Sequence, residues 1–504
     1  MDRGSLPLPK GVSASKFQRF LSGCVAIVGA DNVASDMERV VPYGSTFLPF
    51  DDASHMPGAA VAPESLEQVQ AVLAVARETK VPLWPTSTGR NFGYGTSTVA
   101  DAGTVVLDMR RMNRILDMDP VLGTVVVEPG VTYQQLHDYL KAHGHDFWLD
   151  FPGPGPIVSP MGNTLERGAG QTPYGDHFSN ACGFEVLLAD GTLFRTGMGG
   201  VQNTTSWQSF RYGYGPTLDG LFTQSNFGIV TKMGLWMMPA PEGHRSGLAI
   251  WPEPGDIEKL VDTIRPLRFD GTIGNFGTLG NATLFTAAAE LRSNLYTGPG
   301  AIPQSVVMKY AREKGLGAWM YLFSVYGRKD RVASDWAHIV SKFEASGAHV
   351  IADIDDPMAV NSLTLKSFSL LNWKSGHGLI WFSPVAPARG KDVAKQMELA
   401  ERVTTRHGLD FMTGLTANGR EMLNVIPIVY DRNDADERAR ARACMSELFD
   451  VFEAAGFGFY RTGIGFMDRV AQIHGAKNLE VNRRIKRALD PDGILAPGKS
   501  GIRI

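Results

Sequence analysis

A change of hydrophobic period at residue 81, followed at once by a glycine-rich loop, constrains the fold of this chain more than any other feature. Residues 65–80 repeat apolar side chains at helical spacing, and residues 81–84 read as a short strand. Three glycines, Gly89, Gly93 and Gly95, follow close together. Glycine readily adopts positive φ, so successive backbone N–H groups can converge on an anion. This order predicts a phosphate-binding loop over residues 85–95, with an ordinary surface turn as the alternative.

The length and composition are typical of a two-domain enzyme. The chain has 504 residues, of which 43% are hydrophobic and 20% are charged, which is enough to build more than one core. Its net charge of −3 and the lack of a dense Lys/Arg run argue against a broad nucleic-acid surface. We therefore expect a small-molecule partner and no nucleic acid.

Cysteine and histidine spacing predicts no metal site. Cys24, Cys182 and Cys444 are too scattered for a disulfide framework or a thiolate site, so we expect three reduced, buried thiols. The close pair His143 and His145 has no third ligand motif nearby. The first twenty residues lack a signal-peptide pattern, and no apolar run approaches membrane-spanning length. We expect no membrane insertion and a cytoplasmic location.

The chain divides into three parts. Strand and helix patterns alternate from about residue 60 to 235, which predicts an α/β or α+β architecture. Pro239 and Pro241 then interrupt the pattern, and longer helical patterns occupy residues 243–457. Residues 458–504 return to a turn-rich style. Residues 493–500 match the spacing of a nucleoside-triphosphate loop, but the helix that such a loop needs has no room after Ser500.

Six separated motifs together resemble one family, the vanillyl-alcohol oxidase/p-cresol methylhydroxylase flavoproteins. They are residues 85–95, 129–132, 162–164, 172–177, 195–199 and 496–501, and further similar stretches lie at 87–95, 212–220 and 468–472. The resemblance implies an α+β, two-domain fold. A discontinuous FAD-binding domain would span residues 1–242 and return with residues 458–504, and an α+β cap or substrate domain would span residues 243–457.

The resemblance also implies where FAD lies. It places the pyrophosphate in the loop around Gly89, Arg90 and Asn91, and the flavin at the junction of the two domains. The cofactor-binding residues that it implies are Pro85, Thr86, Ser87, Thr88, Gly89, Arg90, Asn91, Tyr94, Gly95, Pro129, Gly130, Gly162, Asn163, Gly168, Gly170, Tyr174, Gly175, Asp176, Gly228, Val230 and Lys499. The density of glycines among the strand-like runs agrees, because the backbone must approach something closely.

The substrates that the resemblance implies are para-substituted phenols, either 4-alkyl or lignin-type. Tyr94, Tyr460 and Arg461 would bind the phenolate, since two hydroxyl donors and a guanidinium lower the pKa of a phenol. Hydride would leave the benzylic carbon for flavin N5 and give a p-quinone methide. Water would then add to give an alcohol, and a second turnover a carbonyl compound. Without the resemblance, Tyr460 and Arg461 read as a strand-end aromatic and a surface charge.

The positions at which family members attach flavin covalently carry leucine in this chain. The tyrosine position is Leu371 and the histidine position is Leu379. An alkyl side chain has no nucleophile, so we predict a non-covalent FAD. His377 remains the rival anchor, although Gly376 and Gly378 beside it favour a loop.

The substrate pocket also departs from the family pattern. The matching positions around the benzylic carbon are Gly153, Ser367, Trp381, Gly414, Leu423 and Asn424. Gly153 stands where oxidase members carry an aspartate, with Asp150 nearby, which favours a dehydrogenase or hydroxylase over an oxidase. Leucine and glycine take no protons, so the pattern predicts a larger, more apolar pocket without an evident base for water.

The electron acceptor and the assembly are expectations from the resemblance alone: a cytochrome c and a homodimer. A cytochrome partner leaves open a periplasmic location by co-export. One alternative is an O₂-using oxidase of 4-hydroxybenzylic alcohols or eugenol-type phenols in the same family. Another is a catalytically decayed flavin-binding protein, against which the joint presence of Tyr94, Tyr460 and Arg461 argues.

Overall fold

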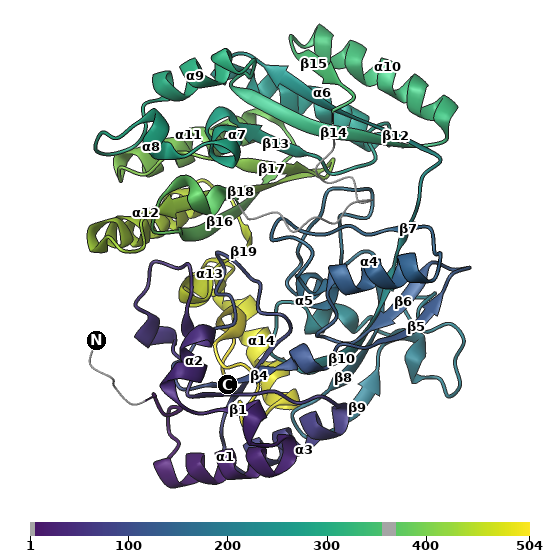
Figure 1. Ribbon diagram of the computed structural model, residues 1–504, viewed down its shortest axis with the longest axis vertical. Helices are drawn as coiled ribbons and strands as arrows, with labels where there is room; N and C mark the ends of the chain where they lie inside the picture. Colours follow the sequence, from purple (N-terminus) through teal and green to yellow (C-terminus); the bar gives the residue numbers. More distant parts are fainter. Residues whose placement is uncertain (1–5, 355–368) are drawn as a thin grey trace.

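The computed structural model of the protein describes residues 6–354 and 369–504. Figure 1 shows a lower part that contains the N-terminal half together with helices α13 and α14, and an upper part built around the largest sheet. Helices and sheets are mixed in both parts, so the predicted α+β architecture is confirmed. No helix in the described ranges is both long and apolar enough to cross a bilayer.

The lower part contains two main sheets. Strands β2, β4 and β3 are parallel and β1 pairs antiparallel at one edge, while the order β5-β6-β10-β8-β9 is antiparallel throughout. The strands are β1 (Val33–Ala34), β2 (Ala59–Val61), β3 (Leu83–Thr86), β4 (Val105–Asp108), β5 (Ile115–Asp119), β6 (Thr124–Val127), β7 (Phe147–Trp148), β8 (Ala181–Leu187), β9 (Leu193–Arg195), β10 (Ile229–Trp236) and β11 (Met238–Pro239). The helices are α1 (Ala14–Val28), α2 (Met37–Gly44), α3 (Leu66–Thr79), α4 (Tyr133–Ala142), α5 (Pro160–Leu165), α13 (Met467–Ile473) and α14 (Ala476–Leu489).

The helix predicted before the glycine-rich loop is confirmed, and the predicted strand lies two residues later than expected, at Leu83–Thr86, so that Pro85 and Thr86 belong to the strand and not to the loop. Helix α3 begins after Ser65, whose hydroxyl accepts a hydrogen bond from Gln68 N at 3.3 Å, and it ends at Lys80, which takes the left-handed conformation. Its apolar face is buried between α1 and the parallel sheet. The glycine-rich loop follows strand β3 directly.

An eight-stranded sheet in the order β15-β12-β14-β13-β17-β18-β16-β19 organises the upper part. Its strands are β12 (Gly243–Trp251), β13 (Thr278–Asn281), β14 (Trp319–Gly327), β15 (His349–Ala352), β16 (Gly378–Pro387), β17 (Gly414–Ala417), β18 (Glu421–Tyr430) and β19 (Phe459–Arg461). Its helices are α6 (Ile257–Phe269), α7 (Ala282–Ala289), α8 (Arg292–Leu295), α9 (Gln304–Glu313), α10 (Lys329–Ala345), α11 (Gly390–Arg406) and α12 (Ala435–Ala454). Strand β19 pairs with β16, so it joins this sheet although it follows residue 457.

The two faces of this sheet have different neighbours. Phe382 of β16 packs against Phe449 and Phe452 of α12 on one face. Trp381 and Ser383 lie on the opposite face, because neighbouring side chains of a strand alternate, and they contact the glycine-rich loop. The upper sheet therefore rests on the loop that follows β3.

The C-terminal segment is held in the lower part by a buried ion pair. Lys486 and Asp490 are 1% and 0% exposed, and Lys486 Nζ lies 2.6 Å from Asp490 Oδ2. Lys486 also donates to the carbonyl oxygens of Asn226 and Leu495 at 2.6 and 2.7 Å. Leu83 N donates to Ile494 O at 2.8 Å, which places the segment beside β3. The run at 493–500 therefore docks against a strand, and only a short 3₁₀ turn (Lys499–Gly501) follows Gly498.

The three cysteines are free and buried, as predicted. Burial raises the pKa of each thiol to about 12, so they are protonated at neutral pH.

Candidate active site

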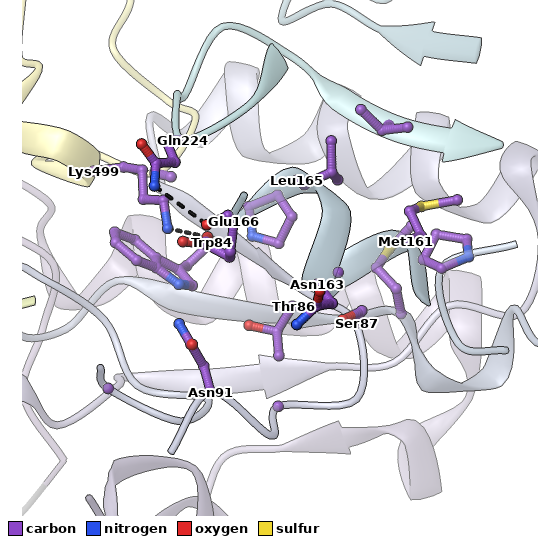
Figure 2. A pocket seen from close by; sticks show the side chains of 18 of the residues that line it. Trp84, Thr86, Ser87, Asn91, Met161, Asn163, Leu165, Glu166, Gln224 and Lys499 are labelled. Carbon is purple, nitrogen blue, oxygen red and sulfur yellow. Dashed lines mark hydrogen bonds and ion pairs between the residues drawn. The ribbon is translucent and has the colours of Figure 1, made fainter. Parts of the chain in front are cut away.

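A groove runs between the loop after β3, helix α5, the start of β10 and the C-terminal segment. It holds about 1230 Å³ of free space, part of it open to solvent. Figure 2 shows Lys499, Gln224 and Glu166 gathered on one side and Thr86, Ser87 and Asn91 on the other. The predicted site residues that line the groove are Pro85, Thr86, Ser87, Thr88, Gly89, Arg90, Asn91, Tyr94, Gly95, Pro129, Gly162, Asn163, Gly228, Val230, Arg461 and Lys499.

The loop after β3 offers a run of free backbone donors to the groove. Within the described part of the chain, no atom accepts a hydrogen bond from the backbone N–H groups of residues 87–91. Gly89 has φ 66°, and a β-carbon there would lie 1.9 Å from Ser97 Oγ. Gly162 on the facing helix α5 is just as close, because a β-carbon there would lie 2.1 Å from Ser87 Oγ. Gly89 lets the loop fold closely onto Ser97, Gly162 lets helix α5 approach the loop, and the free donors form an anion-binding concavity.

Charged side chains meet at one side of the groove. Glu166 pairs with Lys499, and its Oε2 lies 3.9 Å from Arg461 Nη2. Burial alone would raise the pKa of Glu166, but Lys499 and Arg461 hold it below its usual value. Glu166 is therefore ionised at neutral pH, and the three side chains together carry one positive charge.

Tyr94, Tyr460 and Arg461 converge at the junction of the upper sheet and the loop. Tyr94 Oη lies 2.8 Å from Ser383 Oγ, and Arg461 Cζ lies 4.0 Å above the Tyr94 ring. Burial, and next the Tyr94 hydroxyl, raise the pKa of Tyr460 well above its usual value although Arg461 opposes this.

Arg461 has a buried donor in this cluster that makes no hydrogen bond in the described part of the chain. Its Nη2 donates to Asn91 Oδ1, whereas its Nε is buried and has no acceptor among the described residues. A buried unpaired donor is costly, so this atom is suited to receive an acceptor from a ligand.

The upper sheet touches the loop through Trp381. Its Nε1 donates to Phe92 O at 2.9 Å, and a β-carbon on Gly93 would lie 2.4 Å from the indole ring. Leu379, two residues earlier on the same face, is fully buried beside Gly93. His377 is exposed in the left-handed conformation, and its Nδ1 lies 2.8 Å from Leu371 O in the 3₁₀ turn Ser369–Trp373.

The other predicted pocket residues are divided between the two faces of the sheet. Gly414 and Leu423 lie on the face of Trp381, as the strand registers require. Asn424 lies on the opposite face, where it contacts Thr413 Oγ1 at 2.6 Å and Gln396 Oε1 at 3.3 Å. Gly153 is exposed in a turn. Ser367 lies outside the described residues.

Six residues predicted to bind the cofactor do not line the groove, and neither does Tyr460. Four are glycines that leave room for a residue packed against them: a β-carbon on Gly168 would lie 2.2 Å from the Asn163 amide, and one on Gly170 would lie 1.6 Å from Asp150 Oδ1. A β-carbon on Gly130 would likewise clash with Arg110 O, and one on Gly175 would clash with the Phe276 ring. Tyr174 lines a smaller cavity nearby, and Asp176 accepts from Ser179 N at 3.1 Å.

The sequence did not disclose several groove residues. Glu166, Gln224 and Asn226 line the groove, and Ser383 contacts Tyr94. Glu166 lies two residues after the motif at 162–164, and Ser383 lies in the segment that fixes the tether alignment. Gln224 and Asn226 carry no such signal, because only the fold brings them to the C-terminal segment.

Comparisons with known proteins identify the family of this chain. The family described as FAD binding domain matches residues 57–197, and the family described as FAD linked oxidases, C-terminal domain, matches residues 306–500. The 4-cresol dehydrogenase [hydroxylating] flavoprotein subunit of Pseudomonas putida is 41% identical over 99% of this chain and 98% of its own length. The chain belongs to the p-cresol methylhydroxylase family of flavoproteins.

Solved structures agree with this membership of the flavoprotein family. A structure of p-cresol methylhydroxylase with substrate bound has a TM-score of 0.96, 41% identity and 98% coverage of both chains. A 4-ethylphenol oxidase from Gulosibacter chungangensis, solved with isoeugenol, has a TM-score of 0.94 and 32% identity and covers 98% of this chain and 99% of its own.

The groove has the donor set that FAD requires. Free N–H groups at residues 87–91 suit a pyrophosphate, and Lys499 supplies a positive charge on the other side. The residues that are present fit the cofactor that the family binds.

Proposed function

We propose that the protein is an FAD-dependent oxidoreductase that oxidises para-substituted phenols, 4-alkyl or lignin-type, at the benzylic carbon. The observation that carries this proposal is the convergence of Tyr94, Tyr460 and Arg461 beside the groove, with Arg461 Nε buried and unpaired. Both solved relatives described above are named for reactions of para-alkylphenols, which supports the same substrate class.

The three side chains would hold the phenol as its anion. The hydroxyls of Tyr94 and Tyr460 donate hydrogen bonds to the phenolate oxygen, and Arg461 places a positive charge next to it. Ser383 holds the Tyr94 hydroxyl through a hydrogen bond of 2.8 Å. FAD, when bound, supplies the acceptor for the hydride. The oxidised substrate is then a p-quinone methide, to which water adds to give the alcohol; a second oxidation gives the carbonyl compound.

The substrate pocket would lie on the sheet face that carries Trp381. Gly414 and Leu423 share that face, and neither side chain takes a proton or holds water. We propose that this face accommodates a para-substituent bulkier or more apolar than methyl.

Anaerobic spectral titration tests the proposed activity. We expect 4-alkylphenols or 4-hydroxybenzylic alcohols to bleach the bound FAD, and the best substrates to carry more than one carbon in the para chain. If no member of such a panel bleaches the flavin, the protein is a flavin-binding protein without this chemistry.

We further propose that FAD is bound non-covalently. Leu371 and Leu379 carry no nucleophile, and His377 is exposed and points its Nδ1 at a backbone carbonyl. Acid precipitation decides, because non-covalent FAD stays in the supernatant. A yellow pellet would show a covalent bond and would make His377 the anchor to examine first.

The proposed electron acceptor is a cytochrome, supported by the name of the relative as a flavoprotein subunit. The alternative is O₂, which is supported by the 32% identical oxidase. A dehydrogenase would reduce an artificial dye much faster than it consumes O₂, and an oxidase would not. A homodimer and a cytoplasmic or co-exported periplasmic location complete the proposal; light scattering and cell fractionation test them. The domain limits at residues 242 and 457 remain proposals as well.

A further inference from the structure

A buried histidine lies behind the groove in a place that the proposed chemistry does not use. His177 is 6% exposed and stands between Asn163 and Asp150. Its Nδ1 is hydrogen bonded to Asn163 Oδ1. A carbonyl oxygen only accepts, so Nδ1 carries the proton in this bond.

Asp150 lies on the other side of the imidazole. Its Oδ1 lies 3.7 Å from His177 Nε2, which is too long for a hydrogen bond, and Nε2 is buried without a hydrogen-bond partner among the described residues. The carboxylate accepts from Gln171 N at 2.9 Å and from Thr172 N and Oγ1 at 2.7 and 2.6 Å. Burial alone would raise the pKa of Asp150, but His177 and these hydrogen bonds hold it below its usual value. Asp150 is therefore a fixed negative charge beside the ring.

Asn163 connects this pair to the groove. It belongs to helix α5, lines the groove, and packs so tightly on Gly168 that no β-carbon fits there. Its Oδ1 is occupied by His177, and no atom in the described ranges accepts a hydrogen bond from its Nδ2. The orientation of an asparagine amide follows from such a network, so His177 determines which end of the amide is left for a ligand.

We propose that His177 is a positioning residue for FAD. Its Nδ1–H holds Asn163 Oδ1, so that the Asn163 amide donates its N–H groups to the cofactor. This inference rests on the FAD groove and not on the phenol chemistry. FAD binding therefore tests it separately from the proposed substrate.

Two amide replacements distinguish the two ring nitrogens. The side-chain nitrogen of the His177→Asn variant takes the place of Nδ1 and can still donate to Asn163, whereas that of the His177→Gln variant takes the place of Nε2. The holoenzyme is titrated by following the fluorescence of released FAD, and the flavin midpoint potential is measured in parallel. We expect the Asn variant to keep its FAD dissociation constant within about three-fold of the parent, and the Gln variant to bind FAD about ten-fold more weakly with a shifted potential.

A double-mutant cycle tests whether the effect passes through Asn163. Once Asn163→Ala is present, adding His177→Gln should weaken FAD binding by less than about two-fold. His143→Ala is the control, because His143 also bonds through Nδ1, to Tyr139 O at 2.8 Å, but is exposed and does not line the groove. Equal FAD affinity in the Asn and Gln variants, or losses that multiply in the double variant, would overturn the proposal.

Discussion

Tyr94 belongs to both halves of the site. It lies in the loop that carries the free backbone donors, and its hydroxyl meets Ser383 of the upper sheet at 2.8 Å. The loop backbone does not depend on this hydroxyl, because Tyr94 N donates to Asn91 O and Tyr94 O accepts from Ile464 N. Cofactor binding and substrate binding should therefore separate at this residue.

Tyr94→Phe should leave FAD bound and slow phenol oxidation by about ten-fold or more, because one charge-assisted hydrogen bond to the phenolate is lost. Stopped-flow reduction of the flavin by a 4-alkylphenol measures the effect. Tyr296→Phe is a suitable control, because the Tyr296 hydroxyl donates to Pro299 O three residues away and does not line the groove. Loss of flavin from the Tyr94 variant would assign the tyrosine to the cofactor instead.

Glu166 should make the stability of the protein depend on pH. Its folded pKa is lower than the 4.5 of an unperturbed glutamate, so the ionised carboxylate contributes stability above pH 4.5 that is lost as the pH falls through the folded value. Glu166→Gln should lower the free energy of unfolding by about 1–3 kcal/mol at pH 7, and this deficit should shrink below pH 4.5. Thermal unfolding of both proteins from pH 3.5 to 7 measures it; a deficit that is independent of pH would contradict the charge argument.

Single residues differ in how far the sequence predicts them. Tyr94 and Arg461 occupy positions that the family resemblance assigns to phenolate binding. The structure brings the two side chains together, as the resemblance implies. Ser383 and Glu166 occupy the same site without a chemical signal of their own, since a lone serine or glutamate has many ordinary roles. Their partners, Tyr94 and Lys499, are about 300 residues away along the chain, which spacing alone does not reveal.

Among the elements, the loop after β3 depends on space as well as on backbone conformation. Gly89→Ala adds a methyl group that would lie 1.9 Å from Ser97 Oγ, at φ 66°. We expect it to weaken FAD binding by about ten-fold or more, because both the strain of a positive φ and the clash must distort the free donors. Equilibrium binding of FAD to the apoprotein measures this.

Gly144→Ala separates the strain of a positive φ from the steric clash with a neighbour. Gly144 also has φ 66°, but a β-carbon there has no neighbour within 4 Å and the residue does not line the groove. This variant should cost about 1 kcal/mol of stability and leave FAD binding unchanged. Equal FAD affinity in the two glycine variants would remove the loop from the cofactor site.

The glycines at 168–175 show where element-level prediction stops. A dense run of glycines correctly indicated close approach, but the close neighbours of Gly168, Gly170 and Gly175 are Asn163, Asp150 and Phe276. A glycine in the sequence indicates that another group packs closely against the backbone, but it does not indicate whether that group is a cofactor or a protein side chain. The helix of residues 65–80, by contrast, was predictable because its period, its N-cap and its left-handed end are all local.

At the scale of the whole molecule, the Lys486–Asp490 pair holds the C-terminal segment in the groove. Asp490→Asn leaves the Lys486 charge buried without its partner, and we expect a loss of about 3–5 kcal/mol. Asp492→Asn is the matched control two residues away: Asp492 pairs with Lys80 at 2.7 Å, but the two side chains are 42% and 54% exposed, so the loss should stay below about 1 kcal/mol. Urea unfolding measures the stability of both variants. Similar losses would show that the buried pair does not hold the C-terminal segment in place.

The two-domain α+β architecture was predictable because its motifs occur in order along nearly the whole chain. The face on which each pocket residue lies was not. Leu423 and Asn424 were both assigned to the pocket, but adjacent residues of a strand point to opposite faces, and Asn424 faces Gln396 of α11. Only the register of β18 with β16 and β17 decides between them.

The contact between Leu83 and Ile494 also bears on how the protein acquires its cofactor. Strand β3 and its partner segment are about 400 residues apart in the chain, and contacts of such high order form late in folding. The groove is complete only when this contact exists, because Leu495, Ala496 and Lys499 supply one of its sides. FAD uptake should therefore report the formation of this long-range contact, and a refolding chain should gain its secondary structure before it quenches flavin fluorescence.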